Sequence, residues 1–369
     1  MSDLIVTIKE IKKLLPHPNA DNLELVIVDG WQCVVAKETY KEGDLVLHIP
    51  PDALLPWEIA DKWGVARYLS GYEKREKPDA QGNFSTAGRV KAVRLRQEIS
   101  HGCVIPNEGN YKPGDDLASV YGIVKYEPPE DMSWNQGNME KPNVNLYPYS
   151  DVQNERNFSQ VFESEESVIA LEKIHGTNSV IGCVIQEGIE GTPYEIMISS
   201  RKNRRKMGEG SLYEQPLLIT PAFEQMLKNM YAHYTVDEIA PRSVIVYSEI
   251  FGHVQKHFDY GHPDGYNYAC FDISVNGKYL NWDEVVKWCS AYGVNLVPEV
   301  YRGPYNEAKM WELSKGNTLM PMEKPHLREG IVVKCLNERM DVKIGRVILK
   351  FVSDDYLDFS SRKGGTDYH

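Results

Sequence analysis

From Ser167 onward the sequence consists of short apolar runs, each about the length of one strand and separated by turn residues. These runs are SVIALEKI, NSVIGCVI, YEIMISS, RSVIVYSEIFG, YNYACFDI, EGIVVK and GRVILKFV. Two stretches with the apolar spacing of helices, PAFEQMLKNMYAHY and NWDEVVKWCSAYG, lie between them. Because the strands outnumber the helices and do not alternate strictly with them, the pattern predicts an α+β domain built on antiparallel sheets.

The first part of the chain contains further runs of strand length. They are LELVIVDGWQCVVAKE, DLVLHIP, GRVKAVRLRQ and HGCVIP. About five short strands broken by turns favour a small β-barrel. The stretch from 110 to 160 is instead polar and rich in Pro, Asn and Asp, as expected of an extended connection. We therefore predict a barrel domain at 1–125, a connection at 126–160 and the α+β domain at 161–369.

The composition excludes several classes of protein. Apolar residues make up 42% of the 369 residues and charged residues 25%, which is ordinary for folded globular domains. No stretch approaches the roughly 18 consecutive apolar residues of a membrane span, so we expect a soluble, cytoplasmic protein with no membrane partner. The cysteines are scattered and none is spaced as Cys-x-x-Cys, which predicts reduced thiols and no structural zinc.

The net charge of −12 disfavours a nucleic-acid partner, because repulsion at long range slows encounter with phosphates. Two local basic runs oppose this overall charge. One contains Arg201, Lys202, Arg204, Arg205 and Lys206, and the other contains Arg89, Lys91, Arg94 and Arg96. From charge alone each run is more often a solvated face than a binding site, so their neighbours must decide.

Lys173 stands between two predicted strands. It follows the apolar run that ends at Leu171, and Gly176 separates it from the next run, which begins at Val180. A lysine in this position can point into a cleft, and the glycine lets the backbone approach a phosphate closely. The pattern Lys-x-x-Gly alone is weak evidence, because a lysine in a solvated turn is far commoner.

The complete string EKIHGTN at 172–178 is much more specific. It resembles the nucleotidyl-lysine motif of the covalent nucleotidyltransferases, and His175 resembles the RNA ligase branch, since DNA ligases and capping enzymes usually carry Asp there. Further motifs of this superfamily are matched in family order by Ser199-Ser200-Arg201, Glu249-Ile250-Phe251-Gly252, Phe271-Asp272-Ile273, Glu329 to Lys334, and Lys350.

The N-terminal part carries a second resemblance. The segments PHPNADNLELVIV and RLRQEISHGCVIP are similar to the tRNA-binding type of OB-fold domain, a common platform for oligonucleotides. Taken together, the chain most resembles the Deinococcus-type RNA ligase family. This resemblance implies an N-terminal OB-fold β-barrel followed by an antiparallel-sheet nucleotidyltransferase domain, an ATP-grasp-like ligase adenylation domain.

The resemblance also implies ligands and residue roles. ATP would donate AMP, Mg²⁺ or Mn²⁺ would assist, and the partner would be RNA, as a nicked duplex with an RNA 3′-OH strand and no obligate protein partner. Lys173 would be the nucleophile, with Lys350 and His175 also catalytic. The residues implied to bind the nucleotide are Glu172, Ile174, Asn178, Arg201, Glu249, Phe271, Glu329, Lys334 and Lys350. Glu249 and Glu329 would also hold the metal, partly through water. The basic run at 201–206 would bind the RNA backbone.

One position departs from the family pattern. Many relatives carry Lys-x-Lys in the last motif, whereas Ile348 occupies the position two before Lys350. The second cation could then come from Lys334 or Lys343, and the sequence leaves this choice open.

The expected chemistry has three steps. A neutral Lys173 amine attacks ATP, AMP passes to an RNA 5′-phosphate, and a 3′-hydroxyl displaces AMP. Because a lysine is almost wholly protonated near neutral pH, the site must depress its pKa, and a nearby cation would do so. The alternatives are a DNA ligase or capping enzyme, a non-catalytic RNA-binding module, and a tRNA synthetase accessory domain, which would explain only the first third of the chain.

Overall fold

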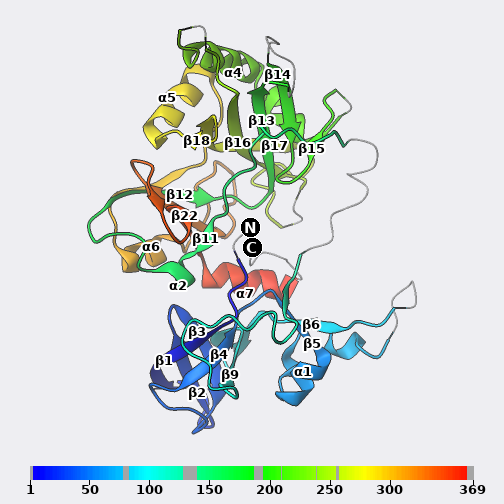
Figure 1. Ribbon diagram of the computed structural model, residues 1–369, viewed down its shortest axis with the longest axis vertical. Helices are drawn as coiled ribbons and strands as arrows, with labels where there is room; N and C mark the ends of the chain where they lie inside the picture. Colours follow the sequence, from blue (N-terminus) through cyan, green and yellow to red (C-terminus); the bar gives the residue numbers. More distant parts are fainter. Residues whose placement is uncertain are drawn as a thin grey trace. The chain divides into compact units, whose positions relative to one another are not determined.

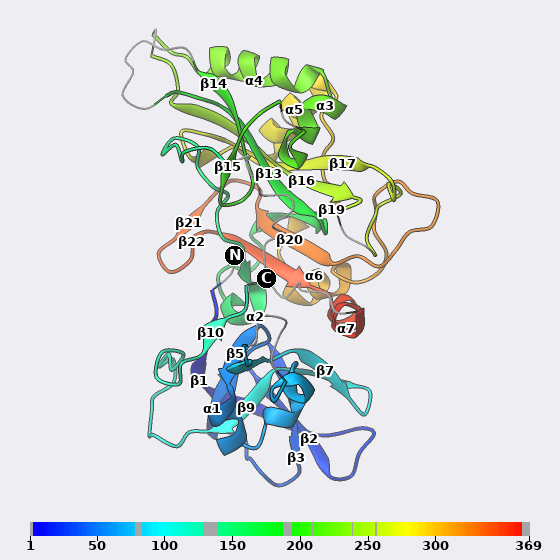
Figure 2. The same ribbon diagram turned by 90° about the vertical axis from the view of Figure 1, so that its right-hand side faces the viewer.

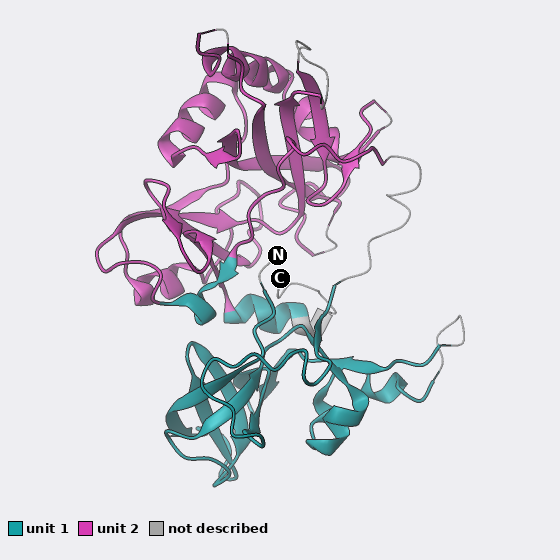
Figure 3. Ribbon diagram, in the orientation of Figure 1, with its two compact units in different colours: residues 1–129, 153–159, 354–369 teal, residues 130–152, 160–353 magenta. Residues whose placement is uncertain are grey.

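The structure is a computed structural model that describes residues 3–77, 83–127, 139–186, 194–208, 210–237, 239–254 and 257–363. The chain forms two compact units, shown in different colours in Figure 3. Unit 1 comprises residues 1–129, 153–159 and 354–369, and unit 2 comprises residues 130–152 and 160–353. In the part of the chain that the structure describes, no helix is both long and apolar enough to cross a membrane.

Unit 1 is built on a curled antiparallel sheet, coloured blue to cyan in Figure 1. Its strands, in spatial order, are β3 (Trp31–Ala36), β2 (Leu23–Val28), β1 (Thr7–Pro16), β4 (Leu45–Ile49) and β9 (Cys103–Pro106). The first half of β1 pairs with β4 and the second half with β2, and a bulge after Ile11 separates the halves. Because a bulge bends a strand and increases its twist, β1 can turn from one neighbour to the other, as closure of a small barrel requires.

In its described residues, unit 1 also contains shorter strands and three α-helices. They are β5 (Ala53–Pro56), α1 (Trp57–Lys62), β6 (Ala87–Arg89), β7 (Ala92–Leu95), β8 (Glu98–His101), β10 (Val124–Lys125), β11 (Gln153–Asn154), α2 (Glu155–Phe158) and α7 (Asp354–Lys363). Strands β10, β5 and β6 form one small sheet, and β7 pairs with β8. Buried apolar side chains from the curled sheet, including Ile8, Leu47 and Ile49, pack with those of α1 and β5 into one core.

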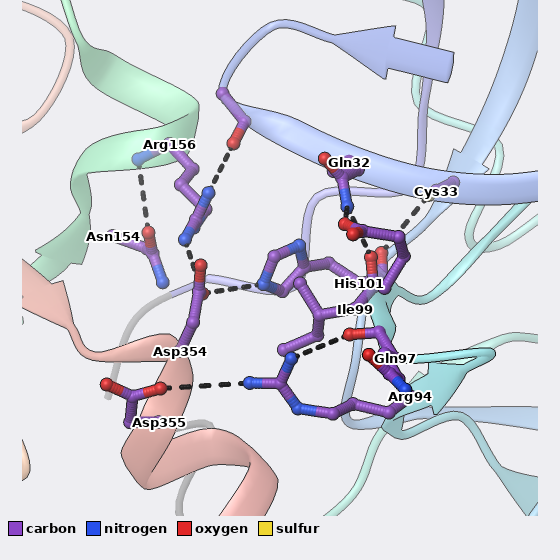
Figure 4. Close-up of polar contacts among 12 residues, drawn as sticks. Gln32, Cys33, Arg94, Gln97, Ile99, His101, Asn154, Arg156, Asp354 and Asp355 are labelled. Carbon is purple, nitrogen blue, oxygen red and sulfur yellow. Dashed lines mark hydrogen bonds and ion pairs between the residues drawn. The ribbon is translucent and has the colours of Figure 1, made fainter. Parts of the chain in front are cut away.

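A polar cluster joins the start of α7 to the strands of unit 1, as Figure 4 shows. His101 Nε2 lies 2.8 Å from Asp354 Oδ1, and Arg156 Nη2 donates to the same oxygen at 2.7 Å. Arg94 Nε lies 3.2 Å from the carboxylate of Asp358. In the second basic run of the sequence, Arg94 is therefore ion-paired with α7, and the Arg89 guanidinium donates to the buried carboxylate of Asp52 at 2.8 Å.

Unit 2 contains two antiparallel sheets. The larger one, in spatial order, has β15 (Arg204–Arg205), β14 (Glu195–Ser199), β13 (Thr177–Val184), β16 (Ser243–Gly252), β17 (Tyr266–Val275) and β18 (Lys278–Tyr279). In the other sheet β23 (Ile348–Val352), β20 (Gly330–Cys335), β12 (Ser167–Lys173) and β19 (Glu299–Pro304) are neighbours in that order. The α+β class and the antiparallel sheets predicted from the sequence are confirmed.

Helices cover one face of the larger sheet, as Figure 2 shows. They are α3 (Gln215–Ile219), α4 (Ala222–His233) and α5 (Trp282–Tyr292), and α4 and α5 are the two helices that the sequence pattern predicts. Helix α5 ends at Gly293, whose left-handed φ of 66° suits a glycine C-cap. The short α6 (Glu307–Leu313) packs on β20, and β21 (Met340–Asp341) pairs with β22 (Gly345–Arg346). With helices on one face, the other face of the larger sheet is available for a site.

The turn at Gly102 provides a test of unit 1. Its φ is +85°, and an added Cβ would lie 2.1 Å from the carbonyl oxygen of Ile49, whereas Gly43 has a similar φ of +88° and open space around it. We expect Gly43→Ala to lower the free energy of unfolding by about 1 to 2 kcal/mol through strain alone. Gly102→Ala should cost about 2 kcal/mol more because it adds a steric clash. Urea unfolding of both variants measures this difference, and equal losses would contradict the predicted clash.

Candidate nucleotidyl transfer site

Lys173 is the last residue of β12, and Gly330, the first residue of β20, is its partner across the sheet. Glu329 precedes this glycine, so its carboxylate comes beside the lysine, and Lys173 Nζ forms an ion pair with Glu329 Oε1. A Cβ on Gly330 would lie 2.1 Å from the carbonyl oxygen of Phe351, so only glycine fits there. The Glu329 side chain is 1% exposed and that of Lys173 is 24% exposed, so the carboxylate is buried while the lysine reaches solvent.

The turn after Lys173 brings the chain from one sheet of unit 2 to the other. The backbone N–H of His175 donates to the hydroxyl of Tyr260 at 2.8 Å, and His175 Nδ1 lies 3.6 Å from Glu329 Oε2. A Cβ on Gly176 would lie 2.1 Å from the carbonyl oxygen of Ile250, so the turn passes too close to β16 for any side chain. Glycine is therefore required at this position of the lysine motif because the backbone packs closely against β16.

Asn178 and Glu249 are direct partners on β13 and β16. Burial, together with the nearby Glu329 carboxylate, raises the pKa of Glu249 to about 7, although Lys173 and His175 act in the opposite direction. The Oδ1 atom of Asn178 is buried and has no hydrogen-bond partner among the described residues. The structure thus brings the predicted residues Lys173, His175, Glu249 and Glu329 into one electrostatically coupled group.

Such a group fits a divalent cation. Burial is the main cause of the raised pKa of Glu249, and the Glu329 carboxylate adds to it, so a divalent cation beside both carboxylates would stabilise their charged forms. Magnesium binds through one or two carboxylates and keeps several waters, so two glutamates suffice. Within the described ranges, no group of three or more His, Cys, Asp or Glu side chains is arranged to hold a metal.

Glu172 and Ile174 have a different environment from Lys173. Strand alternation places Glu172 on the opposite face of β12, where its carboxylate accepts hydrogen bonds from the Thr318 hydroxyl at 2.5 Å and from the Leu319 N–H at 2.7 Å. Burial raises the pKa of Glu172, an effect that these hydrogen bonds oppose. Ile174 is 5% exposed and belongs to the core. Glu172 thereby anchors the 318–319 segment to the strand that carries the lysine.

Phe271 and Asp272 on β17 contact residues that the sequence patterns did not single out. The half-buried ring of Phe271 meets the Tyr149 ring edge to face, with centroids 4.8 Å apart. The Tyr149 hydroxyl donates to Asp272 at 2.8 Å, and Arg346 lies 2.8 Å from the same carboxylate oxygen. Tyr149 lies in the polar stretch that the sequence predicts to be a connection. The sequence signal there for a buried residue is the aromatic pair Tyr147 and Tyr149.

Lys334 and Lys350 lie on the same face of their sheet as Lys173. Lys350 stands opposite Val332, which pairs with Leu171, two positions before Lys173 on β12. The Lys350 side chain is 2% exposed. Lys334 stands opposite Ile348, the position at which many relatives carry a second lysine, but its Nζ donates to Asp272 Oδ1 at 2.8 Å. Lys343 is exposed in the turn between β21 and β22.

The basic run at 201–206 does not form one exposed cluster. Arg201 Nη2 donates to Asp151 at 2.6 Å, and Lys202 is exposed. Arg204 lies 3.6 Å from Glu195, whereas Arg205 is 3% exposed. The hairpin of β14 and β15 thus divides the run between different surroundings, which charge counting could not reveal.

Comparisons with known proteins agree with this geometry. The RNA ligase family model matches residues 166–352, just over half of the chain, and an OB-fold domain model matches residues 5–107. The chain belongs to the RNA ligase family. The family, the OB-fold domain and the enzyme class predicted from the sequence are confirmed. No curated protein matches the chain.

Solved structures share the fold over almost the whole chain. An apo mutant of the Naegleria gruberi RNA ligase is 20% identical, has a TM-score of 0.75, and the match covers 98% of this chain and 100% of that one. A mutant of the same ligase with ATP and Mn has a TM-score of 0.75, and the ligase with PPi has a TM-score of 0.73 at 21% identity. The match covers 96% and 98% of the present chain, and 98% and 99% of the ligase chains, respectively.

The raised pKa of Glu249 predicts a dependence of stability on pH. Between the ordinary value and about 7 the native state keeps a proton that the unfolded chain releases, so this contribution to stability is lost as pH rises through about 7. Without divalent metal, we expect the wild type to lose about 2 kcal/mol of unfolding free energy relative to Glu249→Gln between about pH 5 and pH 8.

Urea unfolding at the two pH values measures this loss. The exposed Glu284→Gln on α5 is the matched control and should not change the pH dependence. Parallel pH profiles for the wild type and Glu249→Gln would contradict the assignment.

Proposed function

We propose that this RNA ligase uses ATP, stores AMP covalently on Lys173, and seals RNA strands that carry 3′-hydroxyl and 5′-phosphate ends. The observation that carries the proposal is the coupled group of Lys173, His175, Glu249 and Glu329 in unit 2. A lysine amine beside two partly buried carboxylates suits a nucleophile whose protonation depends on what else is bound. We assign the remaining nucleotide contacts to Asn178, Arg201, Phe271, Lys334 and Lys350. Glu172 and Ile174 instead stabilise the backbone on either side of Lys173.

The ion pair between Lys173 and Glu329 defines the resting state of the nucleophile. An adjacent carboxylate favours the protonated ammonium, which cannot attack phosphorus. A divalent metal held by Glu249 and Glu329, partly through water, would neutralise these carboxylates and supply positive charge for the phosphates. The neutralised carboxylates no longer stabilise the protonated form of Lys173, so its amine can lose the proton.

Three transfers of AMP follow. The neutral Lys173 nitrogen forms a bond to the α-phosphorus of ATP as the bond to pyrophosphate breaks. The 5′-phosphate of RNA then takes the AMP from Lys173, and a 3′-hydroxyl finally attacks this phosphate as AMP leaves and the hydroxyl proton is lost. Lys350 and Arg201 lie where positive charge can offset the negative charge of these transition states.

We propose that His175 orients the Glu329 carboxylate. Its backbone N–H is bonded to Tyr260, and its ring packs edge to face on Phe258 at 4.9 Å between centroids. The ring therefore faces the Glu329 carboxylate in a defined orientation. This arrangement supports a role in adenylate transfer through Glu329.

The ligands of the structural relatives support the choice of nucleotide and metal. Mutants of the Naegleria gruberi ligase were solved with ATP and Mn and with AMP and Mn, and the ligase was also solved with PPi. We propose that the present chain uses ATP with Mg²⁺ or Mn²⁺ in the same way. We further propose a nicked duplex with an RNA 3′-OH strand as its substrate, because the OB-fold domain adds a second platform for nucleic acid.

Removal of the nucleophile tests the site. Lys173→Ala should lose all covalent labelling on incubation with ATP labelled in the α-phosphate and magnesium, because the Lys173 amine is the proposed point of attachment and forms the ion pair with Glu329. Lys287→Ala, which removes an exposed lysine on α5, is the control and should label normally. Labelling is read from a denaturing gel, and an adduct on Lys173→Ala would refute the assignment.

Sealing of a labelled nick tests the substrate. We expect a nick with an RNA 3′-OH strand to be sealed faster than the same nick built wholly of DNA. Both rates are measured on the preformed enzyme-AMP complex, so differences in ATP use do not enter. Faster sealing of the all-DNA nick would contradict the proposed substrate while leaving the lysine chemistry intact.

A further inference from the structure

Tyr260 is a buried tyrosine with an unusual backbone conformation. It lies in the connection between β16 and β17, its side chain is 1% exposed, and its φ is +49°. A bulky residue rarely adopts this left-handed φ, because its Cβ comes close to the backbone. Such a conformation persists where the surrounding structure requires it, and it is frequent at functional sites. The hydroxyl of Tyr260 lies against the turn that follows Lys173.

The Tyr260 hydroxyl supplies an acceptor that the two sheets of unit 2 do not. It accepts the backbone N–H of His175 at 2.8 Å. His175 lies where the chain leaves β12 in one sheet and enters β13 in the other, so its N–H lies outside both strands. Because a buried N–H without an acceptor is unfavourable, this hydrogen bond favours one conformation of the turn. Lys173 directly precedes the turn, so the conformation of the turn controls where the lysine amine points.

The Tyr260 ring is held on two sides. Its centroid lies 5.0 Å from that of Phe251, near the end of β16, and 4.3 Å from that of His326, which it meets edge to face. The carbonyl of His326 accepts the N–H of Thr318, and the Thr318 hydroxyl donates to Glu172. The ring therefore packs between a strand of the larger sheet and a segment anchored beside the nucleophile, which keeps its hydroxyl in a fixed place.

Three contacts fix the chain on either side of the nucleophile. Before it, Glu172 accepts hydrogen bonds from the segment at 318–319. After it, His175 is bonded to Tyr260, and Gly176 packs against the backbone of β16. The contact made by Tyr260 depends on one oxygen atom, so it can be removed while the ring stays in place.

The Tyr260 hydroxyl is not suited to acid or base chemistry. Burial raises its pKa well above the ordinary value of a tyrosine, and three nearby carboxylates add to this effect, although the hydrogen bond from His175 opposes it. The carboxylates are those of Glu329, Glu172 and Glu249. The hydroxyl therefore stays neutral near neutral pH, and it acts through the turn that it fixes.

We propose that Tyr260 is a positioning residue for AMP attachment, because its hydroxyl fixes the turn after Lys173 and so directs the lysine amine at the α-phosphorus of ATP. This inference rests on the proposed function, since it takes Lys173 as the point of attachment. Formation of the lysyl-AMP bond and transfer of AMP to RNA both need the lysine nitrogen in place. Sealing of an RNA end that already carries AMP does not, because no bond to this nitrogen forms or breaks in that step.

Tyr260→Phe tests the inference, because it keeps the ring and removes the hydroxyl. The maximal rate of enzyme-AMP formation, at saturating ATP and magnesium, should fall about 10- to 100-fold, since a misplacement of about 1 Å can cost about 100-fold in rate. The ATP concentration that gives half of this rate should stay the same, because Tyr260 is not among the proposed nucleotide contacts. Sealing of a preadenylated RNA nick by the same variant should keep the wild-type rate.

Tyr268→Phe is the matched control. Tyr268 is fully buried, and its hydroxyl donates to Thr220 at 2.6 Å. It pairs with Ile250, the neighbour of Glu249, so its ring lies on the other face of the larger sheet. This variant loses a buried hydrogen bond of unit 2, as Tyr260→Phe does, but it should form the adduct at the wild-type rate. Urea unfolding of both variants compares their losses of stability.

A second variant decides the matter if Tyr260→Phe does not fold. His326→Ala keeps the Tyr260 hydroxyl and removes one of the two ring contacts that hold it. It should slow adduct formation and leave sealing of the preadenylated nick unchanged. An unchanged rate of adduct formation in His326→Ala would contradict the inference.

Three further results would overturn the inference. The first is a normal rate of adduct formation in Tyr260→Phe. The second is an equal loss in Tyr268→Phe or in sealing of the preadenylated nick, because either would indicate general damage to unit 2. The third is a higher ATP requirement at an unchanged maximal rate, which would make Tyr260 a nucleotide contact. Absence of an adduct on the wild type would instead refute the proposed function itself, whatever the variants do.

Discussion

The buried carboxylate of Asp272 connects the two sheets on which the whole site is built. Asp272 lies on β17 in the larger sheet, whereas Lys334 lies on β20 in the other, and Arg346 follows from the hairpin beyond it. Although burial acts to raise it, Arg346 and Lys334 hold the pKa of Asp272 below its ordinary value. Removal of one partner would leave a buried charge uncompensated, so the network fixes how the sheets face one another.

This connection explains how Lys173 and the two glutamates come together although they lie on different sheets. The nucleophile and Glu329 belong to the sheet of Lys334, and Glu249 belongs to the sheet of Asp272. Burial of the Glu249 carboxylate is unfavourable by itself, as its raised pKa shows, and the nearby Glu329 carboxylate adds to this effect. The ion pairs of Asp272 stabilise an arrangement that keeps Glu249 buried near Glu329. Added positive charge is favourable there.

Part of this organisation could be predicted from the sequence. The motif around Lys173 and the glutamates at 249 and 329 were identified because each is a short local pattern at the end of an apolar run. Tyr149 and Arg346, two partners of Asp272, were not identified, because they are 123 and 74 residues away in sequence and no local pattern relates them to Asp272. For the same reason the basic run at 201–206 appeared uniform, although the β14–β15 hairpin buries Arg205 and exposes Lys202.

By itself the sequence determined the α+β class, the long strands and the two longest helices of unit 2, and which lysine is the candidate nucleophile, because periodicity and ordered motifs are local properties of the chain. Only the tertiary structure decided which charges are paired. It joined Lys334 to Asp272, turned Glu172 away from Lys173, and buried Arg205 against the ring of Tyr213. The physical reason is that the energy of a charge depends on its burial and on its neighbours in space, and neither is recorded in the spacing of residues along the chain.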